Sequence, residues 1–200
     1  MITTSEQAGE TTQSAPSRPD VGLDVAAVCL RFILGIILLG HGLQKVGWFK
    51  SPGWPSSISE QVDLVGFFGY SHTNLMAWLI TITEVASGSL LLLGLFTPLA
   101  AAAIIGIGFQ GAAGPQWPGG LFGNESAAGL DYSLILMVAA TALAFIGAGR
   151  YSLDSRLPSS IPVRGWRGGT LAVVLAVVVG TIVLVGFGVG FAGHLPPSAF

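Results

Sequence analysis

Apolar residues gather in five long stretches rather than alternating with polar ones. The stretches cover about residues 23–44, 74–95, 98–113, 131–146 and 169–192. A helix crosses the hydrocarbon of a bilayer with about 20 apolar residues, whereas a membrane β-barrel needs strict alternation. The pattern therefore predicts an all-α membrane protein, in which the third and fourth stretches are short for a full crossing.

The segment between the first two stretches has the spacing of an amphipathic helix. Its apolar face consists of Ile58, Val62, Val65 and Phe68. Ser57 and Glu60 form a capping box at its start, and Gly69 is a suitable end. We expect a short helix on the membrane interface. The aromatic residues expected in the head-group layer are Trp48, Trp54 and Tyr70.

Composition supports a membrane protein and excludes other classes. Hydrophobic residues make up 52% of the chain and charged residues 9%, where a soluble domain carries about a quarter charged residues. The net charge of −2, without a basic tract, excludes nucleic acid as a partner. The single cysteine, Cys29, excludes an internal disulfide and thiolate metal clusters, and we expect no metal site.

Basic residues predict the orientation in the membrane. Those expected on one side are Arg18, Arg150, Arg156, Arg164 and Arg167. Only Lys45 and Lys50 fall on the other side. Because cytoplasmic loops carry an excess of Lys and Arg, we expect a cytoplasmic N-terminus and an external C-terminus.

Two opposite charges interrupt the first two stretches near their middles. Such a charge costs about 2.5–3.5 kcal/mol at the centre of a membrane helix. We expect Arg31 and Glu84 to lie at similar depth on adjacent antiparallel helices and to form a pair. Two interpretations stay open: a buried salt bridge that sets helix register, or a polar site that anchors a ligand head group or relays protons.

A second polar group is expected near the external surface. His41 and Lys45 lie four residues apart on one helical face, and Asp131 with Tyr132 begins the fourth stretch. We expect His41, Lys45 and Asp131 to converge beneath the external loops, where His41 is either a proton donor and acceptor or a hydrogen-bonded structural histidine. The GxGxxG string at 106–111 follows no strand and predicts no dinucleotide site.

Short motifs in four of the stretches resemble the DoxX family. They are LR at 30–31 with HGLQK at 41–45, Glu84 followed by GLFTP at 94–98, LDY at 130–132, and GRYSLD at 149–154. The resemblance covers about residues 23–154. It implies a four-helix bundle in a bacterial plasma membrane, so the fifth stretch is a departure from the family pattern.

The resulting organisation combines this bundle with flanking segments. It consists of a disordered cytoplasmic tail at 1–22, the bundle at 23–154, a basic linker at 155–168, a fifth transmembrane helix at 169–193 and an external tail at 194–200.

The resemblance also implies a link to redox chemistry. The family name comes from a subunit linked to thiosulfate:quinone oxidoreduction, and an actinobacterial member is linked to a membrane oxidoreductase complex that handles thiol and oxidative stress. We therefore expect a membrane subunit of a quinone- or thiol-linked oxidoreductase system, with lipid and protein partners and no intrinsic cofactor, although a quinone is a possible ligand. The alternative is a non-catalytic assembly or scaffold subunit.

The candidate residues follow from the two polar groups. Arg31, Glu84 and His41 are the candidates for catalysis. Lys45, Asp131 and Tyr132 are the candidates for ligand binding.

Overall fold

The computed structural model describes residues 21–50, 52, 54–114, 116–124, 128–158, 161 and 165–187. These residues form six α-helices and two short 3-10 turns, namely α1 (Val21–Lys45), α2 (Ile58–Phe67), α3 (Thr73–Leu93), α4 (Thr97–Ala113), η1 (Trp117–Gly119), α5 (Asp131–Ile146), η2 (Asp154–Arg156) and α6 (Gly165–Gly186). The all-α prediction is confirmed for this part of the chain. The first helix begins two residues before the expected tail ends, and the tails at 1–20 and 194–200 lie outside the described residues.

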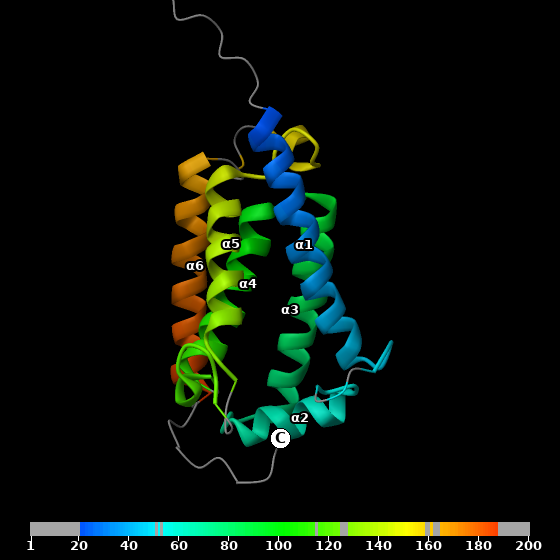
Figure 1. Cartoon of the computed structure of the whole chain (residues 1–200), viewed down its shortest axis with the longest axis vertical. Helices are drawn as coiled ribbons and strands as arrows, with labels where there is room; N and C mark the ends of the chain where they lie inside the picture. The colour runs from blue at the N-terminus through cyan, green and yellow to red at the C-terminus, as the bar shows by residue number, and fades with distance from the viewer. Residues whose placement is uncertain are drawn as a thin grey trace, which may run out of the picture.

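The helices form two groups, which lie closest together at the end opposite α2 (Figure 1). Among the described helices, the antiparallel pair α1 and α3 makes the most extensive contact, and α4, α5 and α6 pack against one another beside them. Helix α2 lies across one end of the bundle, which we call the α2 end. Helices α1, α3 and α6 are long and apolar enough to cross a membrane, whereas α4 and α5 are shorter apolar helices.

Glycines bring α1 and α3 into backbone contact. A Cβ atom on Gly88 would lie 2.5 Å from the backbone nitrogen of Leu39, and one on Gly42 would lie 2.9 Å from the backbone nitrogen of Val85. Only a residue without a side chain permits this approach, as in other membrane helix pairs. The contact sets the register of the two helices, and it places Gly42 of α1 level with Glu84 of α3.

Helix α6 packs on α4 and α5 of its own chain through glycines near both its ends. A Cβ on Gly169 would collide with the ring of Phe145, and one on Gly180 would lie 3.0 Å from the ring of Phe109. The sequence also predicts a small-residue face for helix packing, formed by Gly186, Gly188 and Gly190. Gly186 has nothing within 4 Å of its Cβ position, and the other two lie outside the described residues.

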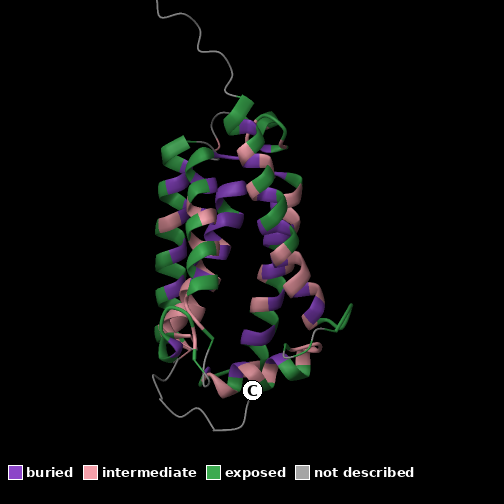
Figure 2. Ribbon diagram, viewed as in Figure 1, coloured by how far each residue is buried: buried purple, intermediate pink, exposed green. Residues whose placement is uncertain are grey.

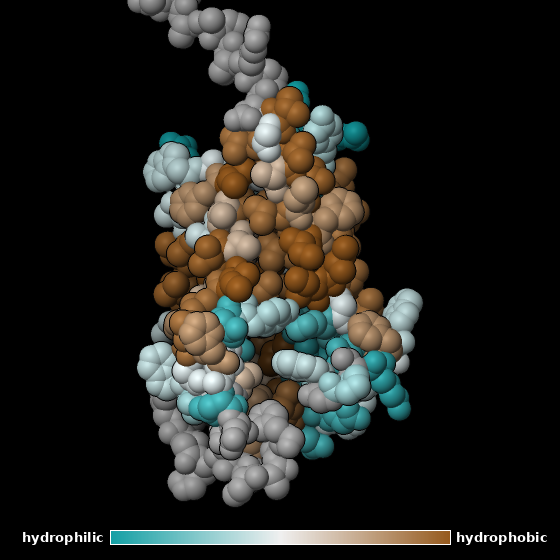
Figure 3. Space-filling model, in the orientation of Figure 1, coloured by the Kyte–Doolittle hydropathy of each residue, from teal (hydrophilic) through white to brown (hydrophobic). Residues whose placement is uncertain are grey.

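The surface of the bundle is apolar over most of its length. Exposed residues cover the outward sides of the helices, and buried ones face inward (Figure 2). Ile36, Ile82 and Ile182 each expose more than half of their surface. Figure 3, which is coloured by hydropathy, shows a brown apolar band across the bundle and more polar residues toward the α2 end. Such an exterior suits contact with lipid hydrocarbon.

The α2 segment follows the expected capping pattern with one change. The backbone N–H of Glu60 donates to Ser57 Oγ over 3.2 Å, but the Glu60 carboxylate accepts from Ser56 N rather than from Ser57 N. The prediction for Tyr70 is wrong, because this residue is 8% exposed and packs with Val65 instead of standing in the head-group layer. The hydroxyl of Tyr70 donates a hydrogen bond to the side chain of Gln110 inside the protein.

Candidate functional site

Arg31 lies at the end of the bundle opposite α2 and binds backbone oxygens. Its Nη1 donates to the carbonyl of Ala148 and its Nη2 to the carbonyl of Tyr151, both over 2.9 Å. The residue is 2% exposed. The turn after α5 therefore folds over the guanidinium and accepts from both of its Nη atoms, whereas Nε is buried and has no hydrogen-bond partner among the described residues.

Two carboxylates complete this arrangement. Asp154, which is 1% exposed, accepts the backbone N–H groups of Phe96 and Thr97 over 2.7 and 2.9 Å, at the start of α4. Asp24 accepts from Arg150 through both the backbone nitrogen and the guanidinium. The hydrogen bond that Arg150 donates to Asp24 raises the pKa of Arg150, which therefore stays charged.

We call this group the Arg31 cluster. It consists of Arg31, Asp24, Arg150, Asp154 and the carbonyl groups of Ala148 and Tyr151. Its described contacts join α1, α4 and the segment after α5, so its polar groups connect parts of the fold to each other.

The expected pair between Arg31 and Glu84 is wrong. Glu84 binds Lys45 instead, with Nζ and Oε2 2.5 Å apart and side chains that are 5% and 11% exposed. The register of α1 and α3 explains the difference. Glu84 is level with Gly42, and the rise of a helix places Gly42 about 16 Å along α1 from Arg31. The two candidate charges therefore belong to opposite ends of the bundle.

A cavity of about 220 Å³ opens beside the Lys45–Glu84 pair. We call it the Glu84 cavity. The polar residues of its lining are His41, Lys45, Gln61, Tyr70, Glu84, Gln110, Gln116, Tyr132 and Ser133, and the remainder is largely apolar. Figure 3 shows the molecule hollowed in this region, below the apolar band and near the α2 end.

Aromatic rings stand on one side of this cavity. The ring of His41 lies 6.2 Å from that of Tyr132, with their planes 25° apart, and 6.0 Å from the ring of Trp54. His41 and Lys45 line this cavity together, as expected, and Tyr132 lines it with them. Asp131 does not join them: it is exposed and absent from the lining. In α5 it is the next residue, Tyr132, whose side chain lines the cavity.

The cavity contains polar atoms without partners. Gln61 Oε1 and Gln116 Oε1 are buried and accept no hydrogen bond from any described residue. The Gln61 residue is 4% exposed. A buried acceptor left unpaired costs about 1–3 kcal/mol, so these oxygens suit a ligand or a water that brings a donor.

A third glutamine belongs to the wall of the cavity. Gln110 accepts from the Tyr70 hydroxyl over 2.9 Å and donates to the carbonyl of Gly180 over 2.7 Å. Burial raises the pKa of Tyr70 to about 12, so its phenol stays a donor at physiological pH. This chain of hydrogen bonds joins the α2 segment, α4 and α6.

Sequence reasoning missed the glutamines, although one of them had a signal. Gln61 lies three residues after Ile58 and four before Val65, which puts it on the apolar face of the predicted helix. A polar residue on that face is a candidate for a buried site. Gln116 lies in a loop between helices, where no periodicity indicates which side chains turn inward.

Comparisons with known proteins agree with the resemblance noted above. The DoxX family model matches residues 26–112, which cover most of α1 and all of α2 to nearly the end of α4, and this confirms the resemblance. An uncharacterized membrane protein of Mycobacterium tuberculosis is 28% identical over 151 residues, or 71% of this chain and 87% of that protein. No solved structure matches the chain.

Proposed function

Since the chain is a membrane protein with a DoxX match over residues 26–112, we propose that it binds a quinone head group in the Glu84 cavity. In this proposal it is a membrane subunit of a quinone- or thiol-linked oxidoreductase system. The observation that supports it most is the buried ion pair of Lys45 and Glu84, which lies in the same cavity lining as glutamine oxygens that lack hydrogen-bond donors.

The size and lining of the cavity suit a quinone ring. Its volume of about 220 Å³ is below the roughly 300–1,000 Å³ of sites for drug-sized ligands, so it fits a head group without its tail. The rings of His41, Tyr132 and Trp54 offer flat surfaces for stacking. A glutamine amide donates to a quinone carbonyl through its NH₂ and accepts from a quinol hydroxyl through its oxygen.

The chemistry of the quinone requires protons from these residues and electrons from elsewhere. Reduction of a quinone to a quinol takes up two electrons and two protons. In our proposal His41 and the Lys45–Glu84 pair deliver protons to the ring oxygens. The electrons come from a partner protein that oxidises a pair of thiols to a disulfide, which releases two electrons and two protons. Arg31 has no part in this step, because it lies at the other end of the bundle, where its two Nη atoms bind Ala148 and Tyr151.

The orientation of the cavity is part of the proposal. The excess of arginines after α5 favours the Arg31 cluster on the cytoplasmic side and the Glu84 cavity on the external side. A single cysteine at Ser155, in a variant that lacks Cys29, tests this orientation. We expect an impermeant thiol reagent to leave it unlabelled in intact cells, and labelling there would reverse the assignment.

A second candidate function is assembly of a membrane complex without catalysis. Large apolar side chains near the α2 end favour it, since Trp48 and Phe122 are 75% and 83% exposed and offer anchors to a protein partner. In this case loss of the cavity residues would leave assembly intact.

Two variants with matched chemistry test the quinone site. Glu84→Gln removes the charge of the cavity pair, and Asp24→Asn removes the charge of the pair with Arg150 at the other end. We expect Glu84→Gln to raise the dissociation constant of a tail-less naphthoquinone about tenfold, which corresponds to about 1.4 kcal/mol, and Asp24→Asn to leave it unchanged. Equal affinity in both variants, or no binding to the unsubstituted protein, contradicts the proposal.

A further inference from the structure

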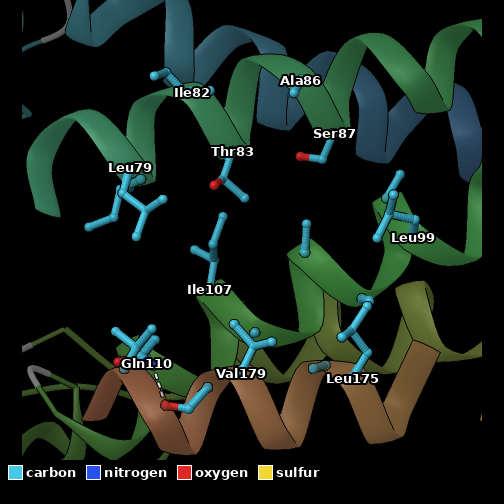
Figure 4. Close-up of a pocket in the computed structure, with 18 of the residues that line it drawn as sticks. Leu79, Ile82, Thr83, Ala86, Ser87, Leu99, Ile107, Gln110, Leu175 and Val179 are labelled. Carbon is cyan, nitrogen blue, oxygen red and sulfur yellow. Dashed lines mark hydrogen bonds between the residues drawn. The ribbon is translucent and has the colours of Figure 1, made fainter. Parts of the chain in front are cut away.

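A second, larger cavity lies between α3, α4 and α6. Its volume is about 420 Å³, and its lining is almost wholly apolar. Figure 4 shows Leu79, Ile82 and Ala86 of α3 on one side and Leu175 and Val179 of α6 on the other. We call it the α3–α6 groove. Both of these helices have the length and hydropathy of membrane-crossing helices, so the groove lies at the depth of the hydrocarbon.

The groove adjoins the Glu84 cavity. Four residues line both spaces: Met76, Ile80, Ile107 and Gln110. Three of these are apolar. The fourth, Gln110, has its amide occupied by Tyr70 and by the carbonyl of Gly180, so it adds no unpaired polar group at the junction. A polar cavity thus adjoins an apolar groove at these four residues.

We propose that the α3–α6 groove holds the polyprenyl tail of the quinone whose ring occupies the Glu84 cavity. The inference rests on the proposed function and adds the path of the tail. In this proposal the ligand enters from the bilayer. Its ring passes Ile107 and Gln110 into the Glu84 cavity, and its tail stays in the groove between α3 and α6. Burial of the tail supplies affinity in proportion to the apolar surface that leaves water.

The charges of the cavity favour this occupant over a phospholipid. Among the described residues of the lining, the charged side chains are Lys45 and Glu84, and they neutralise each other at 2.5 Å. A phosphate head group would enter without an unpaired cation to receive it, and its burial would be costly. A neutral quinone ring needs only donors to its carbonyl oxygens, which glutamine NH₂ groups offer, and the hydroxyls of its quinol form donate to the glutamine oxygens.

The polar groups that reach the groove are few. Ser87 donates to the backbone carbonyl of Glu84 within its own helix over 3.3 Å, and Gln110 is occupied as described. Thr83 also belongs to the lining, and Figure 4 shows its side chain on the groove side of α3. The rest of the lining presents mostly methyl and methylene groups to the occupant. Small residues widen it: Ala86 on α3 and Ala103 and Gly106 on α4 belong to the lining.

The test fills the groove with one side chain and compares a matched substitution elsewhere. Ala86 is exposed and lines the groove, whereas Ala142 is exposed on α5 and lines neither space. Both positions lie on apolar helices, so Ala86→Phe and Ala142→Phe add the same ring to the membrane-facing surface. The ligands are a naphthoquinone with a polyprenyl tail and the same ring without a tail, titrated against purified protein in lipid nanodiscs.

We expect Ala86→Phe to raise the dissociation constant of the tailed quinone at least tenfold and to leave that of the tail-less ring unchanged, with Ala142→Phe equal to the unsubstituted protein for both. If the tail-less ring binds and the two Phe variants bind the tailed quinone equally, the groove inference is wrong and the proposed function stands. If neither quinone binds the unsubstituted protein, the proposed function itself is wrong.

A competition experiment separates the quinone tail from a lipid chain. A phospholipid with a photoreactive acyl chain is incorporated in the nanodisc, and its labelling of α3 and α6 is measured by mass spectrometry. We expect the tailed quinone to suppress labelling of the groove residues and to leave labelling of α5 unchanged. Groove labelling that is indifferent to the quinone identifies the occupant as bulk lipid and overturns the inference.

Discussion

The two ends of the bundle both contain buried charges, but they use them differently. In the Arg31 cluster the guanidinium binds the carbonyls of Ala148 and Tyr151, and Asp154 binds two backbone N–H groups. In the Glu84 cavity, one ion pair stands beside open space and beside glutamine oxygens without donors.

This difference separates structural charges from candidate functional ones. A buried charge whose hydrogen bonds all end on the chain's own backbone stabilises the connection between its segments. A buried pair that borders a cavity leaves room for a third group, and unpaired acceptors around it gain from a ligand that donates. Depth in the membrane does not distinguish the two cases, because Arg31 and Glu84 both lie within long apolar helices.

The largest expected effect follows from removal of Arg31. Arg31→Ala removes the donors to the carbonyls of Ala148 and Tyr151 and the positive charge near Asp154, and each lost hydrogen bond to a charged group costs about 1.5–3 kcal/mol. We expect a marked drop of the melting temperature in detergent, with quinone affinity per folded molecule unchanged.

Arg156→Ala is the control, because Arg156 is exposed in η2. Its melting temperature should match that of the unsubstituted protein. If both alanine variants are equally stable, the Arg31 cluster does not hold the fold together.

The next effect concerns binding rather than stability. Replacement of both members of the cavity pair, in the double variant Lys45→Met with Glu84→Leu, leaves no unpaired charge, and such replacements are often neutral for stability. We expect a melting temperature near that of the unsubstituted protein and loss of at least nine-tenths of the affinity for a tail-less naphthoquinone, which is about 1.4 kcal/mol.

The single variant Glu84→Leu completes this comparison. It leaves Lys45 buried and uncompensated, so it should be less stable than the double variant. If the double variant still binds the quinone ring with full affinity, the ion pair takes no part in quinone binding.

The smallest effect comes from Tyr70. Tyr70→Phe removes one hydrogen bond to Gln110 and should cost about 1 kcal/mol at neutral pH. The pKa of Tyr70 is about 12 in the fold and about 10 in an unfolded chain. Between these values the folded protein holds more protons, so this contribution to stability is complete below pH 10 and falls as pH rises toward 12.

Melting temperatures of Tyr70→Phe and the unsubstituted protein across pH 9 to 12 check this sign. The difference between them should shrink as pH rises through this range. A difference that stays constant would mean that the phenol is not buried as described.

The sequence predicted the helices well because their signal is strong and local. The apolar stretch at 74–95 corresponds to α3 and that at 131–146 to α5, since a run of this hydropathy has no other stable form in lipid. The capping residues Ser57 and Glu60 located the start of α2 for the same reason, because the cap is encoded within four residues.

The candidate site could be predicted only in part. His41, Lys45 and Tyr132 line the Glu84 cavity because each lies at the α2 end of its helix, and position along the chain gives that depth. Their roles in catalysis and binding stay predictions. The partner of Glu84 was wrong because it depends on the register between α1 and α3. That register follows from the contact of Gly42 and Gly88 with the facing helix, and no single-helix pattern encodes it.

Photoaffinity labelling with an azido-naphthoquinone tests the central distinction between the two ends most directly. After irradiation in nanodiscs and digestion, mass spectrometry locates the modified residues. Our account predicts label on His41, Trp54 or Tyr132, suppressed by excess naphthoquinone, and none on residues 147–157. Specific label on that segment, or label spread equally over both ends, would contradict it.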